Sequence, residues 1–343
     1  MLHTCQAGFE TLLGRELAEA GLSPVGQGPG WVLADPGTDP VPTWTGPELA
    51  FSHFSLKAPT EISAPSVNAL AQKILDAFAT GLKGERIESA WTCLWQAAGE
   101  STGLSRRAAA VEFEFGRRLK QMLSRIARQA TGARRVTIGP DHGLFVFFID
   151  FDRALISRDA FFNGPRRMAD DALAPSRSYL KIEEAYGLIG CQPGPGETVA
   201  DLGAAPGGWS YSAAKRGARV LAIDRGALRG GALGNPLIEH RAEDAFTFYP
   251  GGARPFDWLF CDLIEEPHHV LRQIALPWLS RGWCRRFVLN LKFGRVDPLG
   301  LLRELRAPNS PFSLFGNPNR IRHLFHDREE FTIAGTRSSE TFR

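Results

Sequence analysis

The stretch DLGAAPGGWS, residues 201–210, brings a carboxylate and three glycines together where a short apolar run ends. Glycine allows unusual backbone angles and lets a ligand approach closely, and the start of a helix offers N–H groups that no helical carbonyl accepts. The glycines stand at 203, 207 and 208, so the dinucleotide fingerprint GxGxxG is not met. The pattern therefore indicates a bound ligand other than NAD.

Two further carboxylates follow in places where a nucleoside could meet them. Asp224 closes the apolar run RVLAID, 23 residues after Asp201, and could accept hydrogen bonds from both ribose hydroxyls. Asp244, in RAEDAF, could accept from an adenine amino group. Each carboxylate alone could equally be a loop or helix-cap residue. Together with the glycine loop they favour S-adenosylmethionine as the cofactor.

The elements that must position these residues alternate between strand and helix. Apolar strands are expected at 199–203, 219–224, 256–263 and 286–292, separated by helix-length segments, and a last, antiparallel strand at 331–335. Alternation of this kind is typical of an α/β fold with a doubly wound parallel sheet. In such a sheet the ligand lies outside the carboxyl ends of the strands. We therefore predict a Rossmann-like domain with DLGAAPGGWS at its binding edge.

The N-terminal half has a different, α+β pattern. Strands are expected at 1–5, 31–33, 51–58, 89–95, 135–139 and 144–150, the last two joined by the turn PDHG, and helices at 9–21, 67–78 and 106–135. The last of these helices holds nine basic residues against Glu112 and Glu114. Such a helix is equally a solvated arginine-rich face or an RNA-contacting one. Residues 151–176 are expected to be a connection.

Composition narrows the class of protein. The 343 residues are 43% hydrophobic and 22% charged with a net charge of +3, as in a globular protein, and no apolar run approaches the length of a membrane helix. The N-terminus shows no secretory signal. Five scattered cysteines without a CxxC pair favour a reducing cytosol and no structural zinc site. His268 and His269 have no supporting ligand cluster, so no metal is expected.

Five segments together resemble a known family. SRSYLKIEEA, DLGAAPGGWS, FCDLIEEP, LNLKFG and HDREEFTIAG are similar, in this order, to the motifs of the FtsJ-type ribose 2′-O-methyltransferases. The sequences of these segments are most similar to those of bacterial members that methylate a cytidine ribose in 23S rRNA. The resemblance, which is strong over roughly 170–335, implies a ferredoxin-like module at 1–50, a THUMP-like RNA-binding domain at 51–160 and the methyltransferase domain at 161–343. It implies a monomer acting on 23S rRNA or its assembly intermediate.

The resemblance also implies a set of site residues. A Lys-Asp-Lys-Glu tetrad would consist of Lys181, Asp262, Lys292 and Glu329. Glu330 is the alternative for the last position, because a strand would point the two neighbours to opposite faces. Glu329 is favoured, since the family pattern has glutamate directly after Arg328. The residues expected to hold the cofactor are Ser178, Asp201, Gly203, Ala205, Pro206, Gly207, Gly208, Trp209, Asp224, Asp244 and Asp262.

The chemistry explains why such a tetrad would be needed. A ribose 2′-hydroxyl is a poor nucleophile near pH 7, so its proton must be removed while oxygen, methyl and sulfur are aligned. We hypothesise that Lys292 is the base, with its pKa driven down by Lys181, by the cofactor's positive charge and by burial. Asp262 and Glu329 would hold the lysines. A simpler interpretation is an ordinary ion pair between Lys181 and Asp262.

Other functions are less well supported. Methyltransferases of amino groups carry N/D-P-P-Y/F after the fourth strand, and those of cytosine C5 carry a cysteine after proline, whereas this chain has Cys-Asp-Leu-Ile at 261–264. A non-catalytic RNA-binding or assembly protein, or an enzyme acting on another RNA, remain alternatives. A phosphate-binding surface around the pocket could be lined by Arg166, Arg167, Arg177, Arg285, Arg286, Arg320, Arg322 and Arg328.

Overall fold

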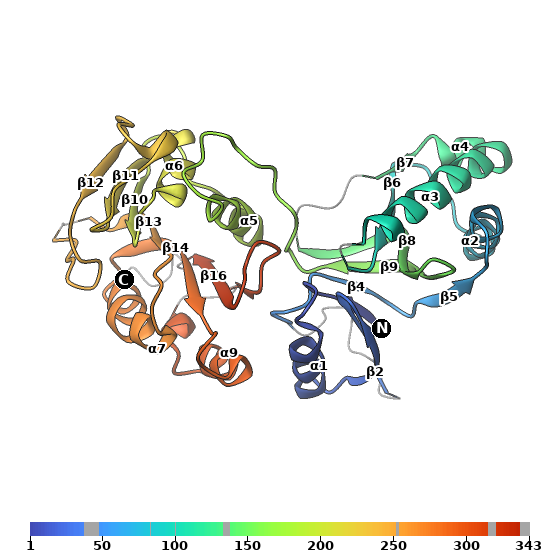
Figure 1. The fold of residues 1–343 in the computed structure, drawn as a ribbon, viewed down its shortest axis with the longest axis horizontal. Helices are drawn as coiled ribbons and strands as arrows, with labels where there is room; N and C mark the ends of the chain where they lie inside the picture. Colours follow the sequence, from blue (N-terminus) through green and yellow to red (C-terminus); the bar gives the residue numbers. More distant parts are fainter. Residues whose placement is uncertain are drawn as a thin grey trace. The chain divides into compact units, whose positions relative to one another are not determined.

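A computed structural model describes residues 1–37, 48–82, 84–99, 101–132, 138–251, 254–314 and 320–336. The chain forms two compact units, Met1–Gly164 and Pro165–Arg343, each of which has its own sheet (Figure 1). None of the helices in these described ranges has the length and apolarity needed to cross a membrane.

The first unit is an α+β structure built on one sheet. Its elements are β1 (Leu2–Thr4), α1 (Glu10–Glu19), β2 (Ser23–Gly28), β3 (Trp31–Asp35), β4 (Phe54–Leu56), β5 (Thr60–Ser63), α2 (Val67–Gly81), β6 (Trp91–Ala97), α3 (Thr102–Met122), α4 (Ser124–Ala127), β7 (Ala130–Thr131), β8 (Gly139–Asp150) and β9 (Arg153–Phe162). The strand order is β2-β3-β1-β4-β9-β8-β6-β7, and β5 pairs with β9. The predicted α+β class of this region is confirmed.

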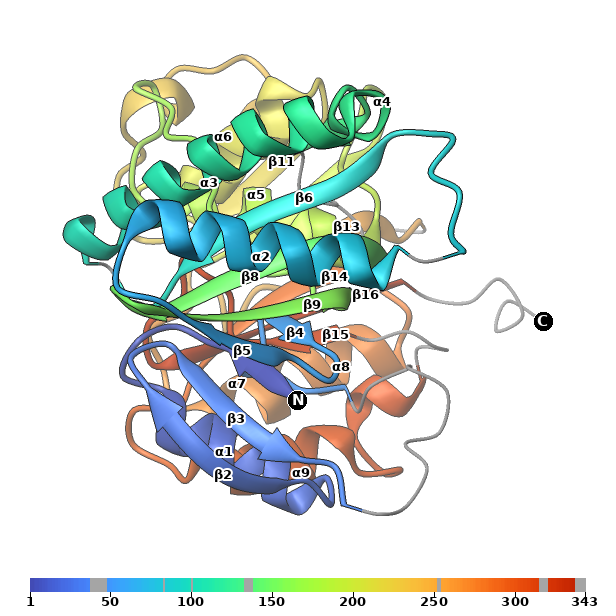
Figure 2. The ribbon, with the colours of Figure 1, turned by 90° about the vertical axis from the view of Figure 1, so that its right-hand side faces the viewer.

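Helices α2 and α3 lie side by side on one face of this sheet (Figure 2). Helix α3 begins where the Ser101 side chain accepts a hydrogen bond from the N–H of Leu104. Its buried residues recur at helical spacing, from Leu104 through Val111 to Leu119. The opposite face carries the basic residues. The amphipathic pattern therefore decides which side of the helix meets the sheet.

Three local predictions for this unit are wrong. The expected turn at 140–143 lies inside β8, and β9 occupies most of the first half of the expected connection 151–176. Antiparallel pairing between these strands, for example Asp141 with Ala160, outweighs the local turn preference of PDHG. The long basic helix ends at Met122 and is followed by the short α4 and β7. Residues 135–137 of the strand predicted at 135–139 lie outside the described residues.

The second unit has the predicted mixed α/β fold. Its elements are α5 (Tyr179–Ile189), β10 (Thr198–Leu202), α6 (Gly208–Lys215), β11 (Arg219–Ile223), η1 (Gly230–Ala232), β12 (Ile238–Arg241), β13 (Phe256–Cys261), α7 (Pro267–Val270), η2 (Leu271–Ala275), α8 (Leu276–Ser280), β14 (Cys284–Lys292), α9 (Pro298–Arg306), η3 (Pro311–Leu314), β15 (Arg320–Arg322) and β16 (Glu330–Thr336). The strand order is β12-β11-β10-β13-β14-β16-β15.

Strand direction in this sheet brings distant parts of the chain to one edge. Strands β10 to β14 are parallel to their neighbours, and β16 is antiparallel to β14, as predicted. The nearly continuous apolar runs of β10, β11, β13 and β14 suit strands that are buried on both faces, whereas β12 is a polar strand at the edge of the sheet. Leu202 lies in register with Ile223 and with Cys261. The residues that follow these strand ends therefore share the carboxyl edge of the sheet.

Candidate active site

The loop after β10 owes its glycines to the turn and to packing within the protein. Gly203 and Gly207 have φ angles of +80° and +106°, which side chains other than hydrogen disfavour. A Cβ on Gly203 would lie 2.6 Å from the side chain of Leu263, and one on Gly207 would lie 2.5 Å from Ala232. Close approach of a ligand is therefore not needed to explain glycine here. The sequence alone could not distinguish these two causes.

Asp224 holds this loop in place. Its two carboxylate oxygens accept hydrogen bonds from the N–H groups of Ala205, at 2.9 Å, and Gly226, at 2.7 Å. The carboxylate is half-buried, and each oxygen retains a second lone pair that a hydroxyl could use. Asp244 is partly used as well, since it accepts from the N–H of Phe246 and pairs with Arg225 at 2.8 Å.

Three of the predicted cofactor residues, Asp201, Trp209 and Ser178, make contacts inside the protein that hold the loop in place. Asp201 is buried and accepts a hydrogen bond from the Ser210 hydroxyl at 2.6 Å, and burial raises its pKa to about 7. The indole of Trp209 is buried against Phe260 and donates to the carbonyl of Ser178 at 2.9 Å. These side chains secure the start of α6, so any contact of Trp209 with a ligand would come from its backbone.

Four charged side chains converge next to this loop. Lys292 Nζ lies 2.6 Å from Asp262 Oδ1 and also contacts Glu330 Oε2. Lys181 Nζ contacts Glu330 Oε1 and lies 3.9 Å from Asp262 Oδ2. The four side chains are between 4% and 24% exposed. Two ammonium groups and two carboxylates thus alternate around a small, mostly buried site.

Each member of this group comes from a different element. Lys181 lies in the first turn of α5, Asp262 directly follows β13, Lys292 ends β14 and Glu330 begins β16. A Cβ on Gly203 would lie 3.5 Å from the Asp262 carbonyl oxygen, so the glycine loop and the charged group are neighbours. The predicted Lys181, Asp262 and Lys292 are therefore brought together, beside the loop that was predicted to bind the cofactor.

The choice of Glu329 for the fourth position needs correction. Lys292 and Glu330 are directly opposite in the antiparallel β14–β16 pair, so their side chains share a face of the sheet. Glu329 is exposed, and its carboxylate lies beside Gly294 instead. The alternative, Glu330, is the residue that contacts both lysines. Strand register decides between the two neighbours.

The electrostatic state of Lys292 also differs from the expectation. Burial lowers its pKa, but the carboxylates of Asp262 and Glu330 outweigh burial and leave the pKa raised above its ordinary value. Burial raises the pKa of Glu330, yet the two ammonium groups leave it lowered. In the protein alone, Lys292 is therefore held as an ammonium ion, and the pKa reduction expected for a base is not built into the four side chains.

Two buried carboxyl groups behind the site were missed from the sequence. Glu184 is completely buried on α5, three residues after Lys181. Asp327 is buried just before β16 and accepts hydrogen bonds from the Thr332 hydroxyl, at 3.0 Å, and the Leu324 N–H, at 2.9 Å. Both residues lie within the segments that resemble the family. The helical spacing of Lys181 and Glu184 was the available signal that they share a face.

The predicted arginine surface is only partly assembled. Arg285 and Arg286 lie at the start of β14, six or more residues before Lys292, and pair with Asp257 and Glu197. Arg322 is buried. Arg285 and Arg286 cannot line the carboxyl edge of the sheet, because a strand carries its two ends far apart, and burial keeps Arg322 from lining any surface. Arg167, whose guanidinium lies over the ring of Phe325, belongs to the segment next to the site.

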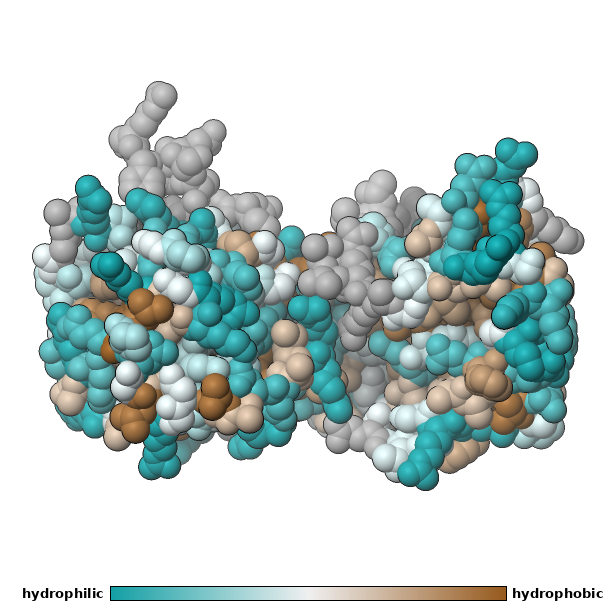
Figure 3. Space-filling view, turned by 90° about the horizontal axis from the view of Figure 1, so that it is seen from above, coloured by the Kyte–Doolittle hydropathy of each residue, from teal (hydrophilic) through white to brown (hydrophobic). Residues whose placement is uncertain are grey.

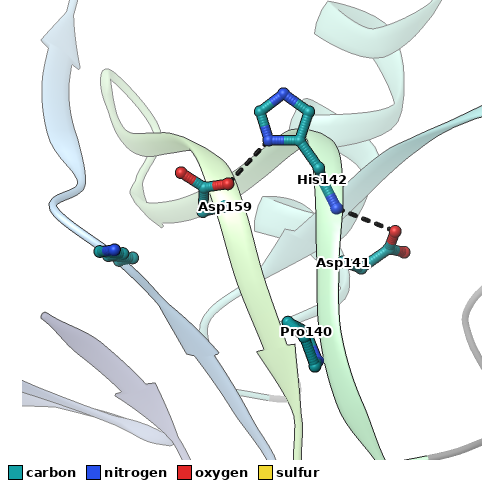
Figure 4. A pocket seen from close by; sticks show the side chains of 5 residues that line it. Pro140, Asp141, His142 and Asp159 are labelled. Carbon is teal, nitrogen blue, oxygen red and sulfur yellow. Dashed lines mark hydrogen bonds and ion pairs between the residues drawn. The ribbon is translucent and has the colours of Figure 1, made fainter. Parts of the chain in front are cut away.

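A separate hollow lies in the first unit and is lined by Lys57, Pro140, Asp141, His142 and Asp159 (Figure 4). The His142 ring is held between Asp159, at 2.7 Å, and Glu85, at 3.0 Å. Within the described ranges, no cluster of three or more histidine, cysteine or acidic residues could hold a metal ion. His142 is thus a structural tie between strands and the neighbouring loop.

Comparison of the sequence with known proteins places this chain in a family. The FtsJ-like methyltransferase model matches residues 174–266. Ribosomal RNA large subunit methyltransferase M of Laribacter hongkongensis is 32% identical over 341 residues, covering 94% of this chain and 90% of that protein. The chain belongs to the ribosomal RNA large subunit methyltransferase M family. This membership confirms the predicted FtsJ-like family and S-adenosylmethionine-dependent methyltransferase class.

Other members of the family match a shorter part of the chain at higher identity. The protein of the same name from Xanthomonas oryzae pv. oryzae is 37% identical over 210 residues, covering 57% of this chain and 58% of that protein. The one from Thauera aminoaromatica is 40% identical over 173 residues, covering 46% of this chain and 45% of that protein.

Proposed function

We propose that this protein transfers a methyl group from S-adenosylmethionine to the 2′-hydroxyl of a cytidine ribose in 23S rRNA. The observation that carries the proposal is the convergence of Lys181, Asp262, Lys292 and Glu330 beside the glycine loop. The substrate comes from the family, whose members are ribosomal RNA large subunit methyltransferases by name. The substrate would be the rRNA or an intermediate in its assembly.

The residues around the loop fit this cofactor. Asp224 has lone pairs left for the ribose hydroxyls, Asp244 could accept from the adenine amino group, and the backbone of 203–208 would border the ligand. The methionine end would then lie towards Asp262, because the loop and Asp262 are neighbours. Bound S-adenosylmethionine supplies an electrophilic methyl group on a positively charged sulfur.

Within this arrangement the four charged side chains have distinct roles. Lys292 takes the proton from the 2′-hydroxyl, which requires that further positive charge beside it outweigh the two carboxylates that raise its pKa. Lys181 is the second ammonium group that opposes protonation of Lys292 and directs the hydroxyl oxygen. Asp262 and Glu330 hold the side-chain nitrogens of Lys181 and Lys292 in place through their carboxylate oxygens. Placement of the hydroxyl contributes to the rate in addition to the base.

A lysine pair tests this proposal. Lys292→Ala should lower kcat by about 10³-fold, within the range for loss of a positioned base, while the Kd for S-adenosylmethionine changes little. Lys215→Ala is the matched control. Lys215 ends α6, its side chain is 49% exposed and it pairs with Asp171, so its replacement should leave kcat unchanged. Turnover is measured with labelled cofactor and 23S rRNA from cells lacking the protein, and mass spectrometry locates the methylated ribose.

Retained turnover in Lys292→Ala would refute the assignment of the base. Cofactor and RNA binding without turnover in the unaltered protein would instead favour a non-catalytic assembly protein. Methylation of a different RNA in the cell would keep the chemistry and change the substrate.

The first unit is proposed to bind the RNA, with a ferredoxin-like module at 1–50 and a THUMP-like domain at 51–160. Support comes from α3, whose solvent face carries Arg106, Arg117 and Lys120 around Phe113, which is 76% exposed. On the face of this unit seen in the space-filling view, groups of hydrophilic side chains alternate with hydrophobic ones (Figure 3, right). An exposed ring between cations can stack on an unpaired base while the cations meet phosphates.

Charge reversal on α3 tests the RNA-binding role. Arg106→Glu should weaken binding of 23S rRNA fragments and reduce the dependence of affinity on salt, because fewer counterions are released. Arg86→Glu, at a residue whose side chain is 90% exposed in the segment between α2 and β6, controls for net charge alone. Equal losses in the two variants would show that α3 has no particular role.

A further inference from the structure

Glu184 connects three segments of the second unit. Its Oε1 accepts hydrogen bonds from the N–H groups of Arg166, at 2.7 Å, and Phe325, at 2.8 Å. Its Oε2 accepts from the N–H of His326 at 3.2 Å. The carboxylate is on α5, whereas its donors lie 18 residues before it and 141 to 142 residues after it. A single buried side chain therefore joins α5 to two distant stretches of backbone.

The same segment is fastened by further contacts. The N–H of Met168 donates to the His326 ring at 2.9 Å, so residues 166–168 and 325–326 are joined directly. Asp327 then binds the Leu324 N–H and the Thr332 hydroxyl, which secures the entry into β16. The segment 324–327 is thus fixed on both sides by buried carboxyl groups.

This junction lies directly behind the charged site. Lys181 is one helical turn before Glu184 on α5, so both side chains lie on the same face of the helix. Glu330 follows His326 by four residues and begins β16, against which α5 packs. The contact between Lys181 and Glu330 requires one particular position of α5 along the direction of β16. The hydrogen bonds of Glu184 to Phe325 and His326 fix this position of the helix relative to the strand.

We propose that Glu184 is a positioning residue that maintains the contact between Lys181 and Glu330 by binding the backbone of residues 325–326. The inference deepens the proposed function and rests on it. Glu184 is buried and is directed to the backbone, so its role is to place Lys181 and Glu330. Burial raises its pKa to about 8, and the N–H groups it binds offset this only in part.

The neighbouring residue provides a matched control. Glu183 is on the same helix, and its side chain is 11% exposed. It binds Arg216, directly after α6, at 2.7 Å and the hydroxyl of Ser212, on α6, at 2.6 Å. Its loss removes a carboxylate of the same type and similar burial without releasing residues 324–327. Stability effects common to both glutamates can thus be separated from the positioning effect.

The test uses the full chain with 23S rRNA from cells lacking the protein, and measures kcat, KM and the Kd for S-adenosylmethionine. Glu184→Ala should lower kcat by about 10²-fold, because small displacements of reacting groups have effects of that size. Glu184→Gln should lower kcat by only roughly tenfold, because its amide oxygen can still accept the two bonds made to Oε1. KM and Kd should change little in both, and Glu183→Gln should retain kcat.

The pH dependence of kcat adds a readout that a purely structural role would not change. Displacing Lys181 alters the charge around Lys292, so the acid limb of the profile should move in Glu184→Ala and stay in place in Glu183→Gln. If Glu184→Ala does not fold, the kcat and the pH profile of Glu184→Gln test the proposal instead.

Two results would overturn the inference. One is a kcat of Glu184→Gln or of folded Glu184→Ala equal to that of the unaltered protein. The other is an equal loss of kcat in Glu183→Gln. Absence of turnover in the unaltered protein would instead contradict the proposed function, so the two failures are distinguishable.

Discussion

The substitution of Glu330 by glutamine tests the structure most directly, because its neighbour Glu329 is a matched control. Glu330 contacts Lys181 with one oxygen and Lys292 with the other, and its side chain is only 4% exposed. Glutamine keeps the shape and can accept one of these two bonds. It loses the other bond and the negative charge that opposes two buried ammonium groups.

The size of the effect follows from these contacts. A hydrogen bond to a charged group contributes about 1.5–3 kcal/mol, and the lost bond together with the lost charge should weaken the site by about 3 kcal/mol. Since about 1.4 kcal/mol corresponds to a tenfold change in rate, the limiting kcat of Glu330→Gln should fall by about 10²-fold. Glu329→Gln, which alters an exposed side chain beside Gly294, should retain kcat.

The pH profile gives a second, independent signature. Glu330 is one of the two carboxylates that raise the pKa of Lys292, so its removal should lower that pKa. The acid limb of kcat should therefore move to lower pH in Glu330→Gln, while the plateau falls. The assay is methyl transfer to 23S rRNA at saturating cofactor between pH 6 and 10. Equal loss in both variants, or an unmoved acid limb in Glu330→Gln, would refute the reasoning.

Three further outcomes are expected. Asp224→Asn should raise the Kd for S-adenosylmethionine by about tenfold in calorimetry, since one charged acceptor is lost; an unchanged Kd would remove Asp224 from the site. Burial raises the pKa of Asp201 and Glu184 to about 7 and about 8, so their stabilising contribution is complete below pH 4 and is lost as pH rises through these values. Urea unfolding should show stability falling by roughly 1 kcal/mol per pH unit for each group, less steeply in Asp201→Asn, and a rise with pH would contradict this. Gly207→Ala should destabilise the protein by about 2–4 kcal/mol through strain and overlap, whereas Gly194→Ala, where a Cβ meets nothing within 4 Å, should not.

Much of the second unit could be predicted from local sequence. Strands β10, β11, β13 and β14 are nearly continuous apolar runs, which are typical of strands buried on both faces of a parallel sheet. The polar strands β12 and β15 were not predicted. The glycines after Asp201 marked the turn correctly. The motif resemblance pointed to Lys181, Asp262 and Lys292, because the residue types and their order along the chain carry that information.

The first unit was predicted less well for a physical reason. PDHG has the composition of a turn, yet residues 140–143 lie inside β8 because β9 pairs with them. Pairing with a distant strand outweighs the weak local preference of a few residues. The basic helix ends at Met122, although apolar spacing suggested a longer one.

The sequence by itself determined the fold class, the family, the loop and three of the four charged residues, because these depend on residue type, spacing and order. Only the tertiary structure decided that Glu330 and not Glu329 meets the lysines, since adjacent residues in a strand differ in direction and direction follows from register. It also decided the ammonium state of Lys292 and the place of Glu184. Both depend on charges and N–H groups that approach from remote parts of the chain.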